Sequence, residues 1–228
     1  MYAGTPAGTD ARKGGTIVKP RRYLPAALAL LLALCLTACG AEKKFERGVV
    51  EGQTYTSQFL ELTCTAPAEY TYLNDEEIAR LNDMAADTAD SASLVEQMRE
   101  RLENGDQVQD MYLMTADGLR TINVMLVKVS AKGAAVDMAA FADLGREQVQ
   151  TTYETMGMTE VEAVREPVIF MGQMYEGIRT TAAYEDVPVT TVQVCMQRED
   201  YVCVITFTSY VEDHTAEMMS FFDALTTE

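Results

Sequence analysis

The sequence predicts one α+β domain built on a mainly antiparallel β-sheet with helices flanking it. Residues 160–210 carry an almost unbroken β pattern that only short turns interrupt. Apolar residues recur at helical spacing in several other segments. Most connections between the expected strands have the length of a hairpin, and hairpins join antiparallel strands. A chain of 228 residues is long enough for one substantial domain and short for two.

The expected domain begins with an extended segment that leads into a helix. Residues 55–67, YTSQFLELTCTAP, mix apolar and polar residues in a β pattern. Asn74 can cap the backbone amide of Glu77 while the Glu77 side chain reaches back, a capping box that starts a helix. Residues 85–93 are small and polar and predict a loop, after which residues 94–102 predict a further helix.

A hairpin and a long helix are expected next. Strand patterns flank Ala116–Leu119, and Asp117-Gly118 within it supplies the positive φ that tight hairpin turns require. A helix over residues 137–156 is predicted by a cap at Asp137 and an apolar stripe. The residues expected in that stripe are Met138, Phe141, Leu144, Val149, Tyr153 and Met156.

The C-terminal third predicts a four-stranded meander and a final helix. The strands are expected near residues 160–170, 174–184, 188–197 and 201–209. Asp213 can cap a terminal helix because its carboxylate can accept from the first free amides. The inward residues of that helix are expected to be Met218, Phe221, Phe222 and Leu225.

Residues 1–39 have the features of an export signal. Lys19, Arg21 and Arg22 precede an apolar run that ends at Leu36 and is shorter than the roughly 20 residues of a spanning helix. The run ends in Leu36-Thr37-Ala38-Cys39, which resembles the lipobox. This resemblance implies that Cys39 receives a diacylglycerol thioether and becomes the first residue of the mature protein.

The expected organisation is therefore a signal peptide, a tether and one domain. These segments are residues 1–39, a polar tether over residues 40–52, and the α+β domain over residues 53–228. The lipid on Cys39 would hold the domain at the extracytoplasmic face of the cell membrane.

The charge of the chain limits its partners. The whole chain has a formal charge of −17. Residues 1–39 hold five basic side chains and one acidic side chain, a contribution of +4, so residues 40–228 carry −21. Such a domain repels nucleic acid and anionic lipid head groups. We therefore expect no nucleic acid partner, and we expect membrane contact through the lipid anchor.

Three cysteines remain once Cys35 leaves with the signal and Cys39 carries lipid. They are Cys64, Cys195 and Cys203, an odd number, so at least one is unpaired. Cys195 and Cys203 lie on consecutive expected strands. A three-residue loop would place them opposite each other and permit a disulfide, whereas a two-residue loop would put them on opposite faces of the sheet.

No motif for catalysis or cofactor binding stands out, so we expect neither an enzyme nor a cofactor. His214 is the only histidine, which excludes a His-rich metal site, and it follows a helix cap where a polar residue is ordinary. Two sets of oxygen-bearing side chains depart from the spacing of a calcium-binding loop, and we expect both to lie in solvated loops. They are Asp83, Asp87 and Asp90, and Asn104, Asp106 and Asp110. Most methionines, including those of MGM at 156–158 and MGQM at 171–174, are expected to fill the core rather than bind copper.

Three stretches have a distinctive pattern of apolar positions and turns: YTSQFLELTCTAPAEYTYLNDEEIARLN (55–82), DMYLMTADGLRTINVMLVKV (110–129) and YVCVITFTSYVEDHTAEMMSFFDAL (201–225). Together they resemble a group of small bacterial lipoproteins with a PsbP-like fold, an antiparallel sheet between helices (an α/β/α sandwich). The sequence departs from the usual pattern of the group at Tyr70, where a Trp is common, and at Cys64. The resemblance implies an accessory or binding role at a membrane surface and assigns no functional residue.

Two functions follow from these observations. The first is a non-enzymatic interaction module that binds another envelope protein through a sheet edge or a helix face. The second is a small-ligand-binding or hydrolytic domain whose site is built from carboxylates and tyrosines.

Overall fold

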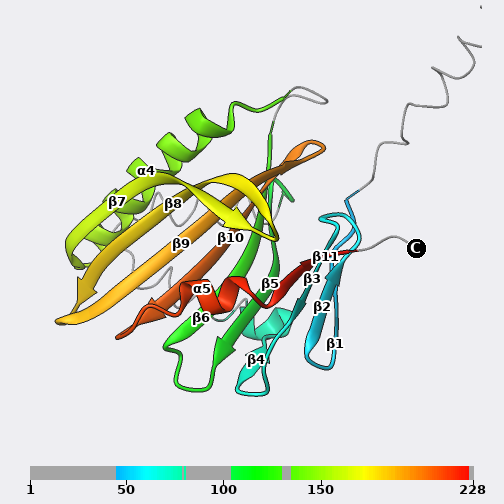
Figure 1. Ribbon diagram of the computed structural model, residues 1–228, viewed down its shortest axis with the longest axis horizontal. Helices are drawn as coiled ribbons and strands as arrows, with labels where there is room; N and C mark the ends of the chain where they lie inside the picture. Colours follow the sequence, from blue (N-terminus) through cyan, green and yellow to red (C-terminus); the bar gives the residue numbers. More distant parts are fainter. Residues whose placement is uncertain (1–44, 79, 81–103, 130–134, 226–228) are drawn as a thin grey trace, which may run out of the picture. The chain divides into compact units, whose positions relative to one another are not determined.

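Two antiparallel sheets make up most of the protein. The computed structural model describes residues 45–78, 80, 104–129 and 135–225, all within one compact unit, Lys43–Glu228. The smaller sheet has the order β1-β2-β3-β11 and the larger has the order β4-β5-β6-β10-β9-β8-β7 (Figure 1). The strands of the smaller sheet are β1 (Val49–Glu51), β2 (Thr54–Ser57), β3 (Leu62–Thr65) and β11 (Phe222–Ala224). Those of the larger are β4 (Tyr70–Tyr72), β5 (Gln107–Thr115), β6 (Arg120–Lys128), β7 (Thr159–Phe170), β8 (Gln173–Tyr184), β9 (Val187–Arg198) and β10 (Tyr201–Tyr210).

The main core lies between the two sheets. Every second side chain of the long strands points from the larger sheet toward the smaller one, where it packs against side chains of the smaller sheet. The ring of Phe222 on β11 lies 5.7 Å from that of Phe207 on β10 and 5.3 Å from that of Phe170 on β7. Other buried members of this core are Tyr55, Leu62, Cys64, Leu113, Ile122, Val124, Leu126, Val192, Val194 and Ile205.

The opposite face of the larger sheet carries the helix α4 (Met138–Thr155), which crosses β7, β8 and β9 (Figure 1). Ala142 of this helix is buried with Ala163 and Ile178 of the sheet. The Tyr153 hydroxyl lies 2.8 Å from the Thr191 hydroxyl of β9. The small size of Ala142 and Ala163 lets helix and sheet approach closely at this contact.

The expected α+β sandwich with helices flanking the sheet, PsbP-like in outline, is wrong. The fold is β-rich, because the inner face of the larger sheet is covered by a second sheet rather than by a helix. The C-terminal segment contributes to this difference. Its helix, α5 (Thr215–Met219), ends early, and Phe222–Ala224 pairs with β3 as strand β11. The apolar pattern of 218–225 fits a helix face, but hydrogen bonding to the otherwise open edge of β3 determines the outcome.

The N-terminal part of the fold also differs from the prediction. Residues 55–67 do not form one extended segment but the hairpin of β2 and β3. Residues 45–52, predicted as part of a tether, belong to the fold. Phe45 packs its ring 5.3 Å from that of Phe59 and 5.2 Å from that of Tyr201, and residues 49–51 pair with β2. The folded domain thus begins closer to Cys39 than the sequence indicates.

Several local predictions are confirmed. Asn74 and Glu77 form the capping box, with bonds of 3.0 and 2.9 Å between side chains and amides. The β5–β6 hairpin, the long helix and the four-stranded meander are present. Within α4 the predicted stripe is only partly correct, because Leu144 is 69% exposed while Ala142 is buried. The predicted loop and helix over residues 85–102 lie outside the described residues.

Gly177 in the middle of β8 is required by close packing on both sides. A Cβ there would lie 2.7 Å from the backbone oxygen of Gln193 and would overlap the Val168 side chain. We predict that Gly177→Ala lowers the free energy of unfolding by about 2–3 kcal/mol, because the neighbours are backbone and core. Thr181→Ala, on an exposed position of the same strand, should cost less than about 1 kcal/mol. Urea unfolding of both variants measures the difference, and equal midpoints would contradict it.

Candidate functional site

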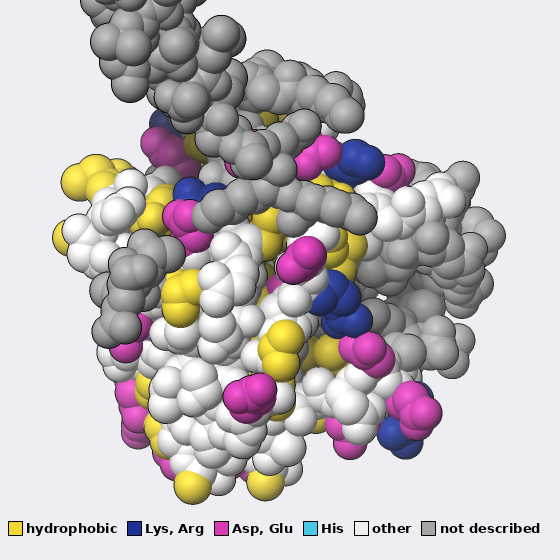
Figure 2. Space-filling model, turned by 90° about the vertical axis from the view of Figure 1, so that its right-hand side faces the viewer, with side chains coloured by type: hydrophobic (Ala, Val, Ile, Leu, Met, Phe, Trp, Pro, Cys, Tyr) yellow, Lys and Arg dark blue, Asp and Glu magenta, His cyan; other side chains and the backbone are white. Residues whose placement is uncertain are grey.

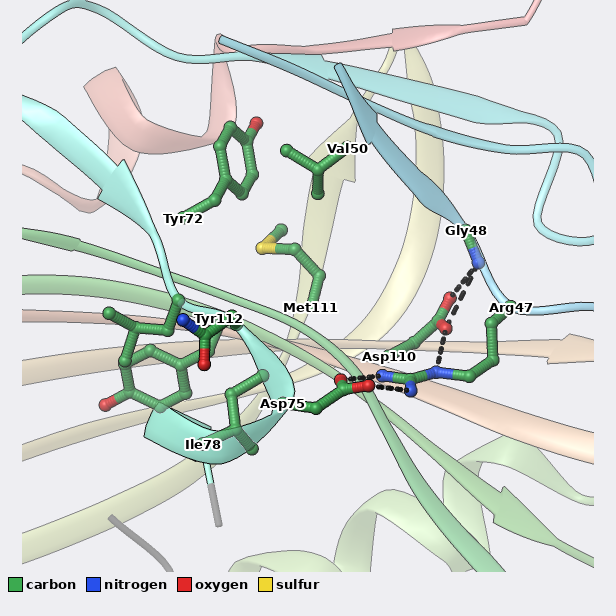
Figure 3. Close-up of a pocket in the computed structure, with 11 residues that line it drawn as sticks. Arg47, Gly48, Val50, Tyr72, Asp75, Ile78, Asp110, Met111 and Tyr112 are labelled. Atoms are coloured by element: carbon green, nitrogen blue, oxygen red, sulfur yellow. Dashed lines mark hydrogen bonds and ion pairs between the residues drawn. The ribbon is translucent and has the colours of Figure 1, made fainter. Parts of the chain in front are cut away.

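A cavity of about 300 Å³ opens on the surface between β1, the end of β4, the start of the helix at Asp75, and β5 (Figure 3). Apolar and aromatic side chains share its wall with polar groups, and its rim carries charged groups. The lining residues are Arg47, Gly48, Val50, Tyr72, Leu73, Asn74, Asp75, Ile78, Asp110, Met111 and Tyr112.

The deepest charged group beside the cavity is the Asp110 carboxylate, whose side chain is 0% exposed. A β-bulge in β5 explains this position. The register shifts between Gln109 and Met111, so that Asp110 and Met111 both turn inward although they are adjacent. A bulge re-aims a side chain in this way because its extra residue has no partner on the neighbouring strand.

Asp110 accepts hydrogen bonds from three directions. The Tyr55 hydroxyl donates to Oδ2 at 2.6 Å, and the Gly48 amide lies 3.2 and 3.1 Å from the two oxygens. Arg47 Nε lies 3.4 Å from Oδ1 (Figure 3). Burial is the largest cause that raises the pKa of Tyr55 well above its ordinary value, so this hydroxyl stays protonated and remains a donor. These bonds replace the water that a buried carboxylate would otherwise need.

Arg47 links the N-terminal segment to two other elements. Its Nη1 and Nη2 lie 3.1 and 3.0 Å from the two carboxylate oxygens of Asp75, and Nη2 also donates to the Gln109 carbonyl at 3.1 Å. Asp75 lies in the first turn of its helix, where a negative charge is favourable. The hydrogen bond to Asp75 is the main cause that raises the pKa of Arg47. The arginine is therefore held in a fixed geometry at the rim.

Gly48 allows the segment to pass close to the ring of Tyr55. A Cβ at this position would overlap the Tyr55 ring carbons and lie 2.7 Å from its hydroxyl oxygen. Any larger residue would push the N-terminal segment away from Asp110. Glycine is thus needed here for close approach.

The apolar wall consists of Val50, Ile78, Met111 and the ring of Tyr72. Tyr72 uses its hydroxyl to donate to the Cys64 carbonyl at 2.8 Å, so its ring faces the cavity without a free polar tip. Val50 is 43% exposed and forms the outer side of the wall. Since Asp75 and Asp110 are both engaged by Arg47 or Tyr55, the arrangement favours binding an apolar group beside a charged rim over transferring protons.

The sequence places Asp110 in one group with Asn104 and Asp106, but the structure buries Asp110 and engages its carboxylate with Tyr55, Gly48 and Arg47. Among the described residues, no cluster of three or more acidic, histidine or cysteine side chains could hold a metal ion. Figure 2 shows acidic side chains spread over this face of the molecule rather than gathered at one point. Cys39 and the group of Asp83, Asp87 and Asp90 lie outside the described residues.

The other predicted sites are also accounted for. His214 lies at the N-cap of α5 with Nδ1 2.9 Å from Glu217. The methionines considered for copper do not converge: Met218 is in the core, Met171 packs against it, and Met174 is exposed.

Arg47, Gly48 and Tyr55 belong to the site but were not predicted as site residues. The one sequence signal for Arg47 and Gly48 is that an arginine and a glycine are adjacent in the segment predicted as a tether, and Tyr55 has no such signal.

Cys195 and Cys203 are free and lie on opposite faces of the larger sheet. The β9–β10 connection is the two-residue turn Glu199-Asp200, so Cys203 pairs with Met196 and Cys195 pairs with Val204. The disulfide that the sequence left open is therefore not formed. Burial raises the pKa of Cys195 to about 12, which keeps it as an unreactive thiol at neutral pH.

No protein-family model matches the chain, and no curated protein matches it. The fold and cavity define a β-rich domain with a small, partly apolar surface site. It is similar to the crystal structure of LpqN from Mycobacterium tuberculosis, described as involved in cell envelope biogenesis. The TM-score is 0.32 at 11% identity, over 51% of this chain and 72% of that chain. It is also similar to a Pseudomonas aeruginosa protein of unknown function, with a TM-score of 0.26 at 17% identity over 45% of this chain and 66% of that one. These scores assign neither a family nor a function, and they give the predicted PsbP-like resemblance no support.

We predict that Tyr55→Phe lowers the free energy of unfolding by about 1.5–3 kcal/mol at pH 7, because a donor to a buried charge is lost. The loss should shrink above about pH 10. There, unfolded tyrosine ionises while the folded hydroxyl, whose pKa is raised, does not, so the wild type loses stability as pH rises. Urea unfolding between pH 7 and pH 11 measures both effects. Tyr184→Phe, at an exposed position, serves as the control. Parallel pH curves for wild type and Tyr55→Phe would contradict a buried, neutral hydroxyl.

We also predict that Cys64, Cys195 and Cys203 resist thiol reagents in the folded protein at neutral pH and all react after unfolding, because each is buried and unpaired. Alkylation followed by peptide mapping measures this result. A peptide pair linked through Cys195 and Cys203 would contradict it.

Proposed function

We propose that this protein is a non-enzymatic interaction module, held by lipid on Cys39 at the extracytoplasmic face of the cell membrane, that binds another envelope protein. The observation that carries the proposal is the short distance between the lipobox and the fold. The ring of Phe45, six residues after Cys39, already packs against Phe59 of the core. Six residues span at most about 21 Å, so a lipid on Cys39 would keep the domain against the membrane.

The edge of the smaller sheet supports binding through strand addition. Within the described residues β1 pairs only with β2, which leaves the backbone groups of its other edge available. Val49 and Val50 are 58% and 43% exposed on this strand. Extended segments of partner proteins bind such edges through main-chain hydrogen bonds.

The edge strand β7 is less suited to this role although it is longer. It carries charged side chains and a proline, which discourage pairing with another strand. These residues are Glu160, Glu162, Arg165, Glu166 and Pro167. The contrast favours β1 as the binding edge.

The cavity lies beside β1 because Val50 forms part of both. A strand added to β1 would bring its side chains to the mouth of the cavity, where an apolar one can pack against Val50 and Ile78. The acidity of the domain favours a partner segment with basic residues next to that apolar side chain.

The cavity itself favours a second candidate, the binding of a small ligand. Its volume of about 300 Å³ is at the lower end for small-molecule sites, and tyrosines and carboxylates line it. Binding is better supported than hydrolysis, because the carboxylates of Asp110 and Asp75 are already engaged by Tyr55 and Arg47.

In-cell photo-crosslinking from position 50 of the full-length protein tests the proposal. We expect one recurring envelope protein, captured by the crosslinker at position 50 and reduced at least tenfold when Val49→Glu is added on the same strand, because a charge at the edge disfavours strand addition. A Cys39→Ala variant should lose the same partner, and mass spectrometry of the mature protein should show acylated Cys39.

A crosslinker at Val164, which is 45% exposed on β7, is the matched control. Equal capture from both positions, or no recurring partner, would contradict binding at β1. An apolar metabolite that co-purifies and is lost in Val50→Glu would favour the small-ligand candidate.

A further inference from the structure

The tip of the β7–β8 hairpin is unusually apolar for this protein. Residues 167–175, PVIFMGQMY, contain no charged side chain in a chain whose formal charge is −17. Ile169 and Met174 face each other across the two strands and are both 73% exposed. No other large hydrophobic side chain among the described residues is more exposed.

The tip is held firmly by the core. Val168 and Phe170 alternate with Ile169 and point inward, and Phe170 is 1% exposed. Its ring lies 5.9 Å from that of Phe207 and 6.3 Å from that of Tyr175. The outward side chains therefore project from a fixed support, so their exposure is a property of the fold.

This tip lies at the same end of the larger sheet as the entry of the N-terminal segment. The β7–β8 turn and the β9–β10 turn are at one end, because successive strands run antiparallel. Tyr201, which begins β10 at that end, packs against Phe45. β8 lies two strands from β10, which places the tip about 10 Å to the side of Tyr201.

We propose that Ile169 and Met174 insert into the lipid surface and form a second membrane contact that orients the domain. The inference rests on the proposed function through the lipid on Cys39. Because at most about 21 Å of chain joins Cys39 to Phe45, the end of the sheet that holds Phe45 faces the bilayer. The tip exposes apolar side chains and carries no charge of its own, so it avoids repulsion by anionic head groups. Apolar side chains of surface proteins enter the head-group and acyl boundary in this way.

A fluorescent label on Met174→Cys tests this contact. The lipidated mature protein is reconstituted into phosphatidylcholine vesicles after labelling with an environment-sensitive dye. Cys64, Cys195 and Cys203 are buried, so the dye reacts only at position 174. We expect a blue-shifted emission and at least twofold quenching by nitroxide groups on lipid chains. The same label at Tyr184→Cys, ten residues along β8 at the opposite end, should show neither.

A second variant checks the role of the apolar side chains. With the label at Gln173→Cys, the substitutions Ile169→Glu and Met174→Glu should abolish the quenching while circular dichroism stays unchanged, because both positions are exposed.

The possible results separate the two proposals. Acylated Cys39 with a solvent-exposed label at position 174 overturns the membrane contact alone. A label that is protected only in native membranes, and not in protein-free vesicles, overturns it in favour of a protein partner. Absence of the acyl group on Cys39 overturns the proposed function and this inference together.

Discussion

The buried carboxylate of Asp110 joins the parts of this protein that the chain itself keeps apart. Its bond to Tyr55 crosses from the larger sheet to the smaller, and its bonds to Gly48 and Arg47 attach the N-terminal segment. Arg47 then extends the network to the helix at Asp75. A buried charge is tolerated only where such partners replace its hydration, so the cavity wall, β1 and the sheet contact depend on the same group.

The elements that could be predicted are those whose signals are local. The meander strands alternate over ten to twelve residues, the β5–β6 turn contains Asp117-Gly118, and α4 begins at a capping aspartate. The strand β11 could not be predicted because it forms by pairing with β3, about 160 residues earlier. Its apolar pattern, with adjacent Phe221 and Phe222, fits a helix equally well. The fold class was missed for the same reason, since β11 completes the second sheet.

The candidate site was hidden from sequence analysis by two structural features. The bulge in β5 buries Asp110 and Met111 together, against the alternation that strand patterns assume. Arg47 and Gly48 lie in a polar stretch with little local preference, and only the contacts with Asp75 and Tyr55 give them a role. Two tyrosines and two carboxylates line the cavity, Tyr72, Tyr112, Asp75 and Asp110, whereas the ligand-binding hypothesis named no particular residue.

The turns of the meander have a consequence for how the protein folds. In the β8–β9 and β9–β10 turns, Glu185, Asp186 and Glu199 adopt positive φ values, between 49° and 67°, that residues with a side chain disfavour. Their hairpins therefore gain little from the turns, and strand pairing depends on collapse of the side chains between the sheets. Folding of this half of the molecule should start from the hydrophobic centre and proceed outward to the loops, which makes it slow compared with hairpins closed by Asn-Gly.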